Sequence, residues 1–273
     1  MGEATASLAG ITASIVSHHH GREVDRLLAE LAALGEPLLR RVIVTLNCPD
    51  QMWAERWRAG RWPFELRLIE RSAPLGFGAN HNRAFTLDGE DGEDGGWPLF
   101  AVLNPDLHLL ANPFPALRAR LLDDGRVGVA YPPQCDARGH RQDHERLAPT
   151  PARLLRRHLL RRPLELRPGQ SPDWVNAAFL LLRRTAYAEL KGFDEGFHMY
   201  CEDVDLCLRL QLAGWRLARA DAALVLHQAQ RASHRSGQHL LWHVRSLLHL
   251  WRSPVWRAWQ ARGLTEKTPK ASP

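Results

Sequence analysis

The sequence predicts an α/β protein built on a mostly parallel sheet that is flanked by helices. Two observations lead to this fold class. Apolar, β-branched stretches alternate along the chain with segments of helical periodicity, and glycine and proline residues separate the two kinds of segment. Parallel strands need a crossover connection, which is usually a helix, so a repeated strand–helix–strand order favours a parallel sheet. At 273 residues, the chain is long enough to bury a sizeable core.

The composition narrows the class of partner. The chain is 45% hydrophobic and 24% charged, as in an ordinary globular protein, and its net charge of +6 predicts attraction to an anion such as a phosphorylated substrate or an acidic membrane face. It carries no helix-turn-helix, zinc-finger or aromatic RNA-binding signature, so we expect no nucleic-acid partner. No apolar run approaches the roughly 20 residues that cross a bilayer, and the N-terminus lacks the layout of a secretory signal. We therefore expect a cytoplasmic protein.

The first two strands and the helix between them begin the sheet. Residues 10–17 are rich in β-branched side chains and predict a strand. Residues 24–34 place apolar side chains at helical spacing, and Gly35 and Pro37 end that helix. Residues 41–47 then predict a buried strand. This is the order of a βαβ unit, whose two strands run parallel.

Two loops in the first part of the chain are candidates for ligand contact. His18 begins a triple histidine directly after the first strand, at the edge where open α/β sheets bind ligands. After a third strand at 64–70, Gly76 and Gly78 let the backbone approach a ligand closely, and the helix that follows can turn its free N–H groups toward a phosphate. A plain turn into a helix explains the same glycines. The acidic, glycine-rich stretch 88–96 predicts a solvated surface loop.

A further strand, 97–103, ends in Asn104-Pro105-Asp106. A carboxylate placed where a buried parallel strand ends lies on the binding edge of the sheet, where it can hold Mg²⁺ or Mn²⁺ through its oxygen atoms. The alternative is a simple turn, because Asn-Pro and Pro-Asp are common turn formers. A helix at 115–122 and a strand at 127–131 follow.

An acidic cluster stands at the start of a later helix that ends at Gly214. Glu202, Asp203 and Asp205 repel one another, and at least one pKa should rise unless a cation or the helix N-terminus offsets the charge. We expect a reaction centre here. The alternative is a charged helix cap in which Asp205 pairs with Arg209 one turn later.

The last part of the chain adds one more candidate ligand and an appendage. His227 follows a short strand and either completes a metal site or is structural. We expect one domain over residues 1–235 and an amphipathic C-terminal helix and tail over 236–273. That helix places leucines opposite Arg245 and Arg252, which fits a peripheral membrane contact, docking onto the body of the protein, or a dimer contact. The oligomeric state stays open.

In this order, the motifs resemble the family 2 glycosyltransferases, particularly their bacterial rhamnosyltransferase-like branch, over residues 10–235. The resemblance is carried by Gly76-Phe77-Gly78 with Asn82, by Asn104-Pro105-Asp106, by Trp174, and by the run from Gly192 to Arg209, which is the most specific of the four. It implies a GT-A fold, which is Rossmann-like, and an enzyme that binds a nucleotide-sugar with a divalent metal and inverts the anomeric centre in a single displacement.

The resemblance also implies roles for individual residues. Asp106 would hold Mg²⁺ or Mn²⁺ against the diphosphate, and His227 would complete that metal site. Asp203 matches the general base, and Glu202 and Asp205 would tune and orient it. The nucleotide-sugar site would comprise His18, Asn47, Gly76, Gly78, Asn82, Asn104 and Trp174, the last as a wall for the sugar or acceptor.

Three positions depart from the family pattern. The second strand ends in Asn47 where the family has an Asp-Asn pair that reads the nucleotide, and Asn176 replaces a glycine after Trp174. The Gln-x-x-Arg-Trp motif of processive members lacks its arginine here, which favours transfer of one sugar per encounter. We expect an inverting transferase that moves a sugar, for example rhamnose from dTDP-rhamnose, to a saccharide or lipid-linked acceptor in surface-polysaccharide synthesis. A GT-A-like nucleotidyltransferase and a non-catalytic glycan- or nucleotide-binding module remain as alternatives.

Overall fold

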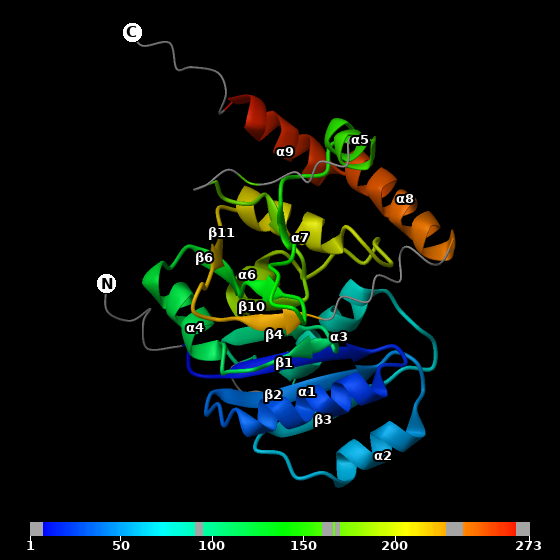
Figure 1. Ribbon diagram of the computed structural model, residues 1–273, viewed down its shortest axis with the longest axis vertical. Coiled ribbons are helices and arrows are strands. Elements are labelled where there is room, and N and C mark those ends of the chain that lie inside the picture. The colour runs from blue at the N-terminus through cyan, green and yellow to red at the C-terminus, as the bar shows by residue number, and fades with distance from the viewer. Residues whose placement is uncertain (1–7, 91–94, 160–165, 167–169, 228–236, 266–273) are drawn as a thin grey trace.

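The computed structural model of the chain describes residues 8–90, 95–159, 166, 170–227 and 237–265. A seven-stranded sheet with the order β11-β6-β10-β4-β1-β2-β3 crosses the molecule (Figure 1). Its strands are β1 (Ile11–Ser17), β2 (Leu39–Leu46), β3 (Glu65–Glu70), β4 (Leu99–Leu103), β6 (Val127–Tyr131), β10 (Phe179–Arg183) and β11 (Arg216–Arg219). The mostly parallel α/β fold predicted from the sequence is confirmed.

The helices come between the strands, as the periodicity predicted. They are α1 (Gly21–Ala33), α2 (Gln51–Ala59), α3 (Phe77–Glu90), α4 (Phe114–Asp123), α5 (Pro151–Leu159), α6 (Arg184–Glu189), α7 (Glu202–Leu212), α8 (Gly237–Arg252) and α9 (Pro254–Thr265). Helix α2, whose Trp57 is completely buried, was not predicted from the sequence.

Strand β10 is the exception to the parallel order. It lies antiparallel between β4 and β6, so its first residue, Phe179, pairs with Leu103 at the end of β4. The turn that precedes β10 therefore comes to the edge where β1, β2 and β4 end. That edge is where an α/β sheet binds its ligands.

Short strands add two small sheets beside this edge. Strand β12 (Val225–His227) lies between β5 (Leu107–His108) and β7 (Gln134–Cys135) in one of them. The other pairs β8 (Glu145–Arg146) with β9 (Trp174–Val175). In the first small sheet His227 pairs with Leu107, so two segments far apart in sequence meet just after β4.

The core lies on both faces of the large sheet. Alternate residues of β4 show how: Ala101 and Leu103 pack with α1, α2 and α4 on one face, and Phe100 and Val102 pack with α3, α6 and α7 on the other. Successive side chains of a strand point to opposite faces, so a strand buried on both sides is apolar throughout. This explains why β4 consists of Leu-Phe-Ala-Val-Leu.

The acidic stretch at 88–96 was predicted to be a solvated loop, and for its first residues this is wrong. Helix α3 continues to Glu90, and Asp88 is completely buried. Its carboxylate accepts hydrogen bonds from Thr12 (2.6 Å) and Arg41 (2.7 Å) and pairs with Arg184. Two arginines therefore compensate the buried charge. Residues 91–94 lie outside the described part of the chain.

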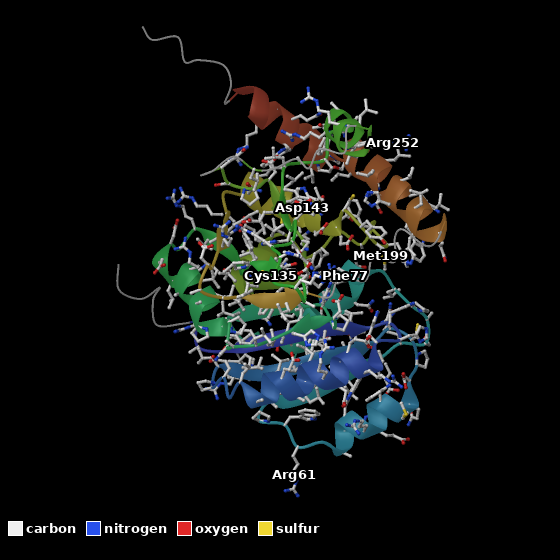
Figure 2. The ribbon with its side chains drawn as sticks, in the orientation of Figure 1. Arg61, Phe77, Cys135, Asp143, Met199 and Arg252 are labelled. Carbon is white, nitrogen blue, oxygen red and sulfur yellow. The ribbon has the colours of Figure 1, made fainter. Side chains whose placement is uncertain are left out.

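Helices α8 and α9 pack against the main body at the end away from α2 (Figure 1). Leu250 and Trp256 are buried in the core on the α7 side, and the Trp251 indole donates to the Pro149 carbonyl oxygen (2.9 Å). Figure 2 shows Arg252 at this end and Arg61 at the opposite one. The predicted domain boundary at 235/236 lies outside the described residues. Among the described helices, none is both long and apolar enough to cross a bilayer.

Candidate active site

The carboxyl ends of three neighbouring strands carry candidate residues. His18 follows β1, Asn47 follows β2 and Asn104 follows β4. The Asn104 N–H donates to the Ala178 carbonyl oxygen (2.8 Å), which joins this edge to the turn before β10. Parallel pairing of β1 with both β2 and β4 thus places these residues along one edge of the sheet.

Asp106 and His227, the two predicted metal ligands, lie side by side. His227 Nε2 is 3.3 Å from Asp106 Oδ1, and both side chains are largely buried. Gln142 holds the histidine, because its amide donates to the His227 carbonyl oxygen (2.6 Å) and its Oε1 lies 3.2 Å from His227 Nδ1. The other ring nitrogen is thereby directed to Asp106. A carboxylate beside an oriented imidazole is a donor set that suits a divalent cation such as Mn²⁺.

A second group of potential ligands was not anticipated from the sequence. One donor atom each from His18, His19 and Cys48 lies within 4.8 Å of the others. Burial, and then the neighbouring His19 and His20, lower the pKa of His18. A thiol and two imidazoles suit softer metals, whereas Mg²⁺ takes oxygen ligands. The donor chemistry therefore favours Asp106 and His227 for Mg²⁺ or Mn²⁺.

The acidic cluster begins α7 after an unusual backbone. Tyr200 and Cys201 have φ angles of 70° and 65°, so two consecutive residues that are not glycine adopt the left-handed conformation. This conformation costs about 1 kcal/mol or more per residue and persists where the surrounding structure imposes it, often at functional sites. Helix α7 begins directly after these two residues, with Glu202 buried and Asp203 half-buried in its first turn.

Glu202 and Asp203 have abnormal pKa values. Burial, reinforced by the adjacent Asp203, raises the pKa of Glu202 to about 8. Burial raises the pKa of Asp203 to about 6, opposed by hydrogen bonds from the backbone N–H groups of Val204 and Ala177. Among the described residues, Glu202 Oε2 is buried without a hydrogen-bond partner. Glu202 is buried and Asp203 is half-buried beside it, so the pair retains a proton at neutral pH, which is an arrangement suited to proton transfer.

Asp205 has a different role from its two neighbours. Its Oδ2 accepts a hydrogen bond from Arg209 Nε (2.6 Å), and Arg209 Nη1 donates to the carbonyl oxygens of Leu190 and Gly192 (2.9 Å each). Asp205 thus orients the arginine that fastens the loop before α7. This is the helix-cap pairing that the sequence left open as the alternative, and it places Asp205 in support of the site.

The glycine motif and Asn82 contact the loop that leads into α7. A Cβ atom on Gly78 would lie 2.5 Å from Cβ of Phe193, and one on Gly76 would lie 2.6 Å from the His198 carbonyl oxygen. The two glycines therefore admit the segment 193–198. Close backbone approach was predicted, but the partner is the loop that leads into α7.

Asn82 fastens the same loop to α3. Its amide donates to the Phe193 carbonyl oxygen (2.9 Å) and to Glu195 (3.0 Å), and its Oδ1 accepts from the Tyr187 hydroxyl (2.7 Å) and the Phe193 N–H (2.9 Å). An asparagine amide has two donors and a carbonyl oxygen with two lone pairs. All of this capacity is used within the fold.

Trp174 and Asn176 belong to the segment that leads into β10. The Trp174 indole donates to the Leu147 carbonyl oxygen (3.0 Å), and the Arg146 guanidinium lies 5.2 Å from its ring centroid. Asn176 and Gln134 exchange two side-chain hydrogen bonds (2.6 and 3.1 Å). The strand that carries Gln134 is paired with β12, so this amide pair connects the turn beside Asp203 to the strand that ends in His227.

Sequence comparisons identify rhamnosyltransferases as relatives. The chain is 29% identical to the N-acetylglucosaminyl-diphospho-decaprenol L-rhamnosyltransferase of Mycobacterium tuberculosis. The alignment, 274 residues long with its gaps, covers 91% of this chain and 88% of the relative. It is 43% identical over 76 residues, 27% of the chain and 28% of the relative, to the rhamnosyltransferase WbbL of Escherichia coli K12. No family model matches the chain.

Solved glycosyltransferase structures share the fold. The mannosyltransferase PcManGT of Pyrobaculum calidifontis, in complex with GDP-Man and Mn²⁺, aligns with a TM-score of 0.55 at 14% identity over 94% of this chain and 76% of its own. Residues 1–349 of S. aureus TarS, in complex with UDP-GlcNAc, align with a TM-score of 0.58 at 16% identity over 85% of this chain and 60% of that one. Identities this low establish the architecture alone.

Proposed function

We propose that this chain, a rhamnosyltransferase-like family 2 glycosyltransferase with a GT-A fold, moves one sugar from a nucleoside-diphosphate sugar to a hydroxyl group of a lipid-linked saccharide. The observation that carries the proposal is the pairing of Asp106 with His227 at the sheet edge, together with an Asp203 of raised pKa joined to that edge through the turn before β10. Relatives named as rhamnosyltransferases support L-rhamnose as the sugar.

Asp106 and His227 would hold Mg²⁺ or Mn²⁺. When bound, such an ion neutralises the charge that develops on a leaving diphosphate, with no proton transfer. Gln142 keeps the His227 ring in the orientation that this requires. His18 and Asn47 would line the nucleotide end of the same edge, although the Asn47 amide is already hydrogen-bonded at both its oxygen and its nitrogen to the Leu75 backbone (2.8 and 3.0 Å).

Asp203 would act as the general base. A base must be ionised at the working pH and yet basic enough to accept a proton, and a pKa raised to about 6 meets both requirements. It would take the proton of the acceptor hydroxyl as that oxygen attacks the anomeric carbon. A single base and a single displacement invert the anomeric centre. Glu202, with the higher pKa, would remain protonated beside it.

The acceptor and its location follow from the same comparison. The mycobacterial relative is named for a diphospho-decaprenol acceptor that carries N-acetylglucosamine, and we propose an acceptor of that class here, in surface-polysaccharide synthesis at the cytoplasmic face of a membrane. Exposed leucines on α8 support a peripheral contact with the bilayer. Residues 1–235 would form the transferase domain, and residues 236–273 would form the contact.

The test uses the full chain with dTDP-rhamnose, Mn²⁺ and a synthetic N-acetylglucosaminyl-diphospho-polyprenol. We expect release of dTDP, addition of one rhamnose to the acceptor by mass spectrometry, and an anomeric configuration opposite to that of the donor. EDTA should abolish the reaction and added Mn²⁺ should restore it. Release of pyrophosphate would identify a nucleotidyltransferase. If no nucleotide-sugar from a broad panel were turned over in the presence of metal, the enzymatic proposal would be wrong.

A further inference from the structure

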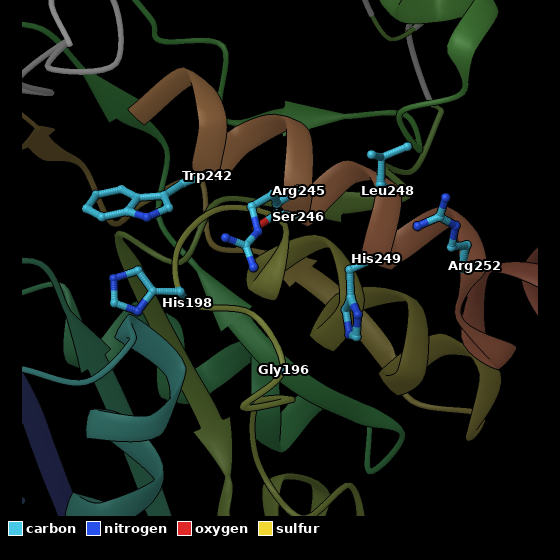
Figure 3. Close-up of a pocket in the computed structure, with 8 residues that line it drawn as sticks. All are labelled: Gly196, His198, Trp242, Arg245, Ser246, Leu248, His249 and Arg252. Atoms are coloured by element: carbon cyan, nitrogen blue, oxygen red, sulfur yellow. The ribbon is translucent and has the colours of Figure 1, made fainter. Parts of the chain in front are cut away.

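A cavity of about 510 Å³ lies between α8 and the loop that leads into α7 (Figure 3). Gly196 and His198 line it from the loop, and Trp242, Arg245, His249 and Arg252 line it from the helix. Figure 3 shows the side chains of Arg245 and His249 pointing from α8 toward the loop, whereas Arg252 lies farther along the helix and points to the side of Leu248. None of these residues has a part in the proposed reaction.

The cavity is electropositive. Neither Arg245 nor Arg252 has a carboxylate partner within the described part of the chain, and the sequence from Gly237 to Thr265 contains no Asp or Glu at all. The acidic side chain recorded at this surface is Asp194, whose Oδ2 lies 3.6 Å from His249 Nε2. A guanidinium group keeps its charge at any physiological pH and binds phosphate oxygens through two parallel hydrogen bonds. Two such groups in one cavity predict a ligand with phosphate groups.

The cavity is connected to α3 and to the segment that precedes the proposed base. At α3, the His198 carbonyl oxygen accepts from the Phe77 N–H (3.1 Å). On the side of the base, the Ser246 hydroxyl donates to the Met199 carbonyl oxygen (2.8 Å), four residues before Asp203. A ligand anchored here would therefore lie beside the loop that positions the general base.

The same helix also exposes an apolar edge. Leu240, Leu241, Val244 and Leu248 are exposed, and Leu248 borders the cavity as well. Soluble proteins seldom leave a run of leucines along one helix in water unless something covers it. The helix thus combines an anion-binding cavity with an apolar strip that adjoins it. A lipid diphosphate has the same two parts, an anionic head and a hydrocarbon chain.

We propose that this cavity binds the diphosphate of the lipid-linked acceptor, through Arg245 and Arg252, while the apolar edge of α8 meets the lipid chain at the bilayer surface. The inference rests on the proposed function, because it names where that reaction's acceptor is held. It assigns Arg245 and Arg252 to acceptor specificity and gives them no part in the chemical step.

The first experiment measures binding without turnover. Geranyl diphosphate is titrated by calorimetry into the full chain in EDTA, with no nucleotide-sugar, so that the metal site cannot capture the probe. We expect the Arg245→Ala/Arg252→Ala variant to bind on the order of tenfold to a hundredfold more weakly than wild type, since hydrogen bonds to charged groups are lost. Arg257→Ala, an exposed arginine of α9 outside the cavity, is the matched control and should bind as wild type does.

Two further arms identify the ligand. Inorganic pyrophosphate should bind more weakly than geranyl diphosphate, because it lacks the hydrocarbon. Phosphatidylglycerol vesicles should still bind the double variant through the leucines of α8. Loss of vesicle binding with unchanged affinity for geranyl diphosphate would overturn the proposal, because the arginines would then serve lipid headgroups. The proposal would also be overturned if wild type, the Arg245→Ala/Arg252→Ala variant and the Arg257→Ala control all bound geranyl diphosphate with equal affinity.

A kinetic experiment separates this proposal from the proposed function. In the double variant, KM for the lipid diphosphate acceptor should rise, whereas KM for dTDP-rhamnose should stay unchanged. An alkyl N-acetylglucosaminide without a diphosphate should be used equally by the variant and wild type. If geranyl diphosphate binds as expected but no sugar is ever transferred, the proposed reaction fails and the diphosphate site stands. If transfer occurs and the acceptor KM does not change, the site fails and the reaction stands.

Discussion

Two groups of polar side chains lie at the two ends of one loop, residues 192–201, and they differ in how their hydrogen-bonding capacity is used. At the first end, Asn82 makes four hydrogen bonds, which use the whole capacity of its amide. At the other end, Glu202 keeps an unpartnered buried oxygen, and the pKa of Asp203 is raised by burial. Buried polar groups whose hydrogen bonds are all made stabilise a fold, whereas carboxyl groups with strongly raised pKa values are typical of functional sites. The first end is scaffold and the second is the candidate reaction centre.

Asp203→Asn should separate the two ends most clearly. The amide cannot accept the hydroxyl proton, so we expect kcat to fall by about 10²- to 10⁴-fold, the usual contribution of a general base. The free energy of unfolding at neutral pH should stay the same or rise, because the variant removes a carboxylate whose ionisation burial disfavours. Steady-state kinetics and urea unfolding measure the two quantities. Asp123→Asn on α4, an exposed carboxylate, is the control. Full activity in Asp203→Asn would remove this residue as the base.

Asn82→Ala should give the opposite result. It leaves the Phe193 N–H and the Tyr187 hydroxyl without their partner in the interior, which costs about 1–3 kcal/mol of unfolding free energy for each unsatisfied group. Donor affinity at low temperature, where the variant is folded, should change little, because Asn82 has no hydrogen-bonding capacity left for a ligand. Urea unfolding and calorimetry with the nucleotide-sugar provide the measurements. A large loss of donor affinity with unchanged stability would return Asn82 to the nucleotide site.

The pH dependence of kcat/KM and of the unfolding free energy should test the role of Asp203. Below the raised pKa of Asp203, about 6, the base is protonated, so kcat/KM should fall about tenfold per pH unit. Stability should change in the other direction. Because the folded pKa lies above the unfolded one, Asp203 contributes stability that is fully present below about pH 4 and is lost as pH rises through about 6. Comparing wild type with Asp203→Asn across this range isolates the effect. An unfolding free energy whose pH dependence is identical in both proteins would contradict the assignment.

The same distinction explains what could be predicted from the sequence. The mostly parallel sheet and the meeting of Asp106 with His227 were predictable, because a carboxylate or histidine at the end of a short apolar strand is visible as a local pattern and the carboxyl ends of parallel strands meet at one edge. Asp106 and His227 do meet, at 3.3 Å. Hydrogen-bond partners were not predictable in this way. Asn82 and Gly78 carry the same local signal whether they face a ligand or the chain itself, and only the fold brings Phe193 against them.

Asp88 shows a second limit of sequence reasoning. Its stretch of acidic and glycine residues has the composition of a solvated loop, but Arg41 and Arg184 reach it from positions distant in sequence and bury its charge. Long-range ion pairs leave no trace in local composition. Asp205 was the easier case, because its partner Arg209 stands one helical turn away and the spacing alone predicts the pair.

Glu202→Gln compares the two members of the acidic pair and should have the smallest effect. Burial and the neighbouring Asp203 raise the pKa of Glu202 to about 8, so at pH 7 its carboxyl group is protonated and a neutral amide of the same shape replaces it closely. We expect nearly unchanged kcat at pH 7 and a change confined to the region above pH 8, where wild type would ionise Glu202 beside Asp203 and the variant cannot. Rate profiles of both proteins from pH 6 to pH 9 measure this. If Glu202→Gln instead lost as much activity as Asp203→Asn, Glu202 would be the residue that accepts the proton, and the assignment within the pair would be reversed.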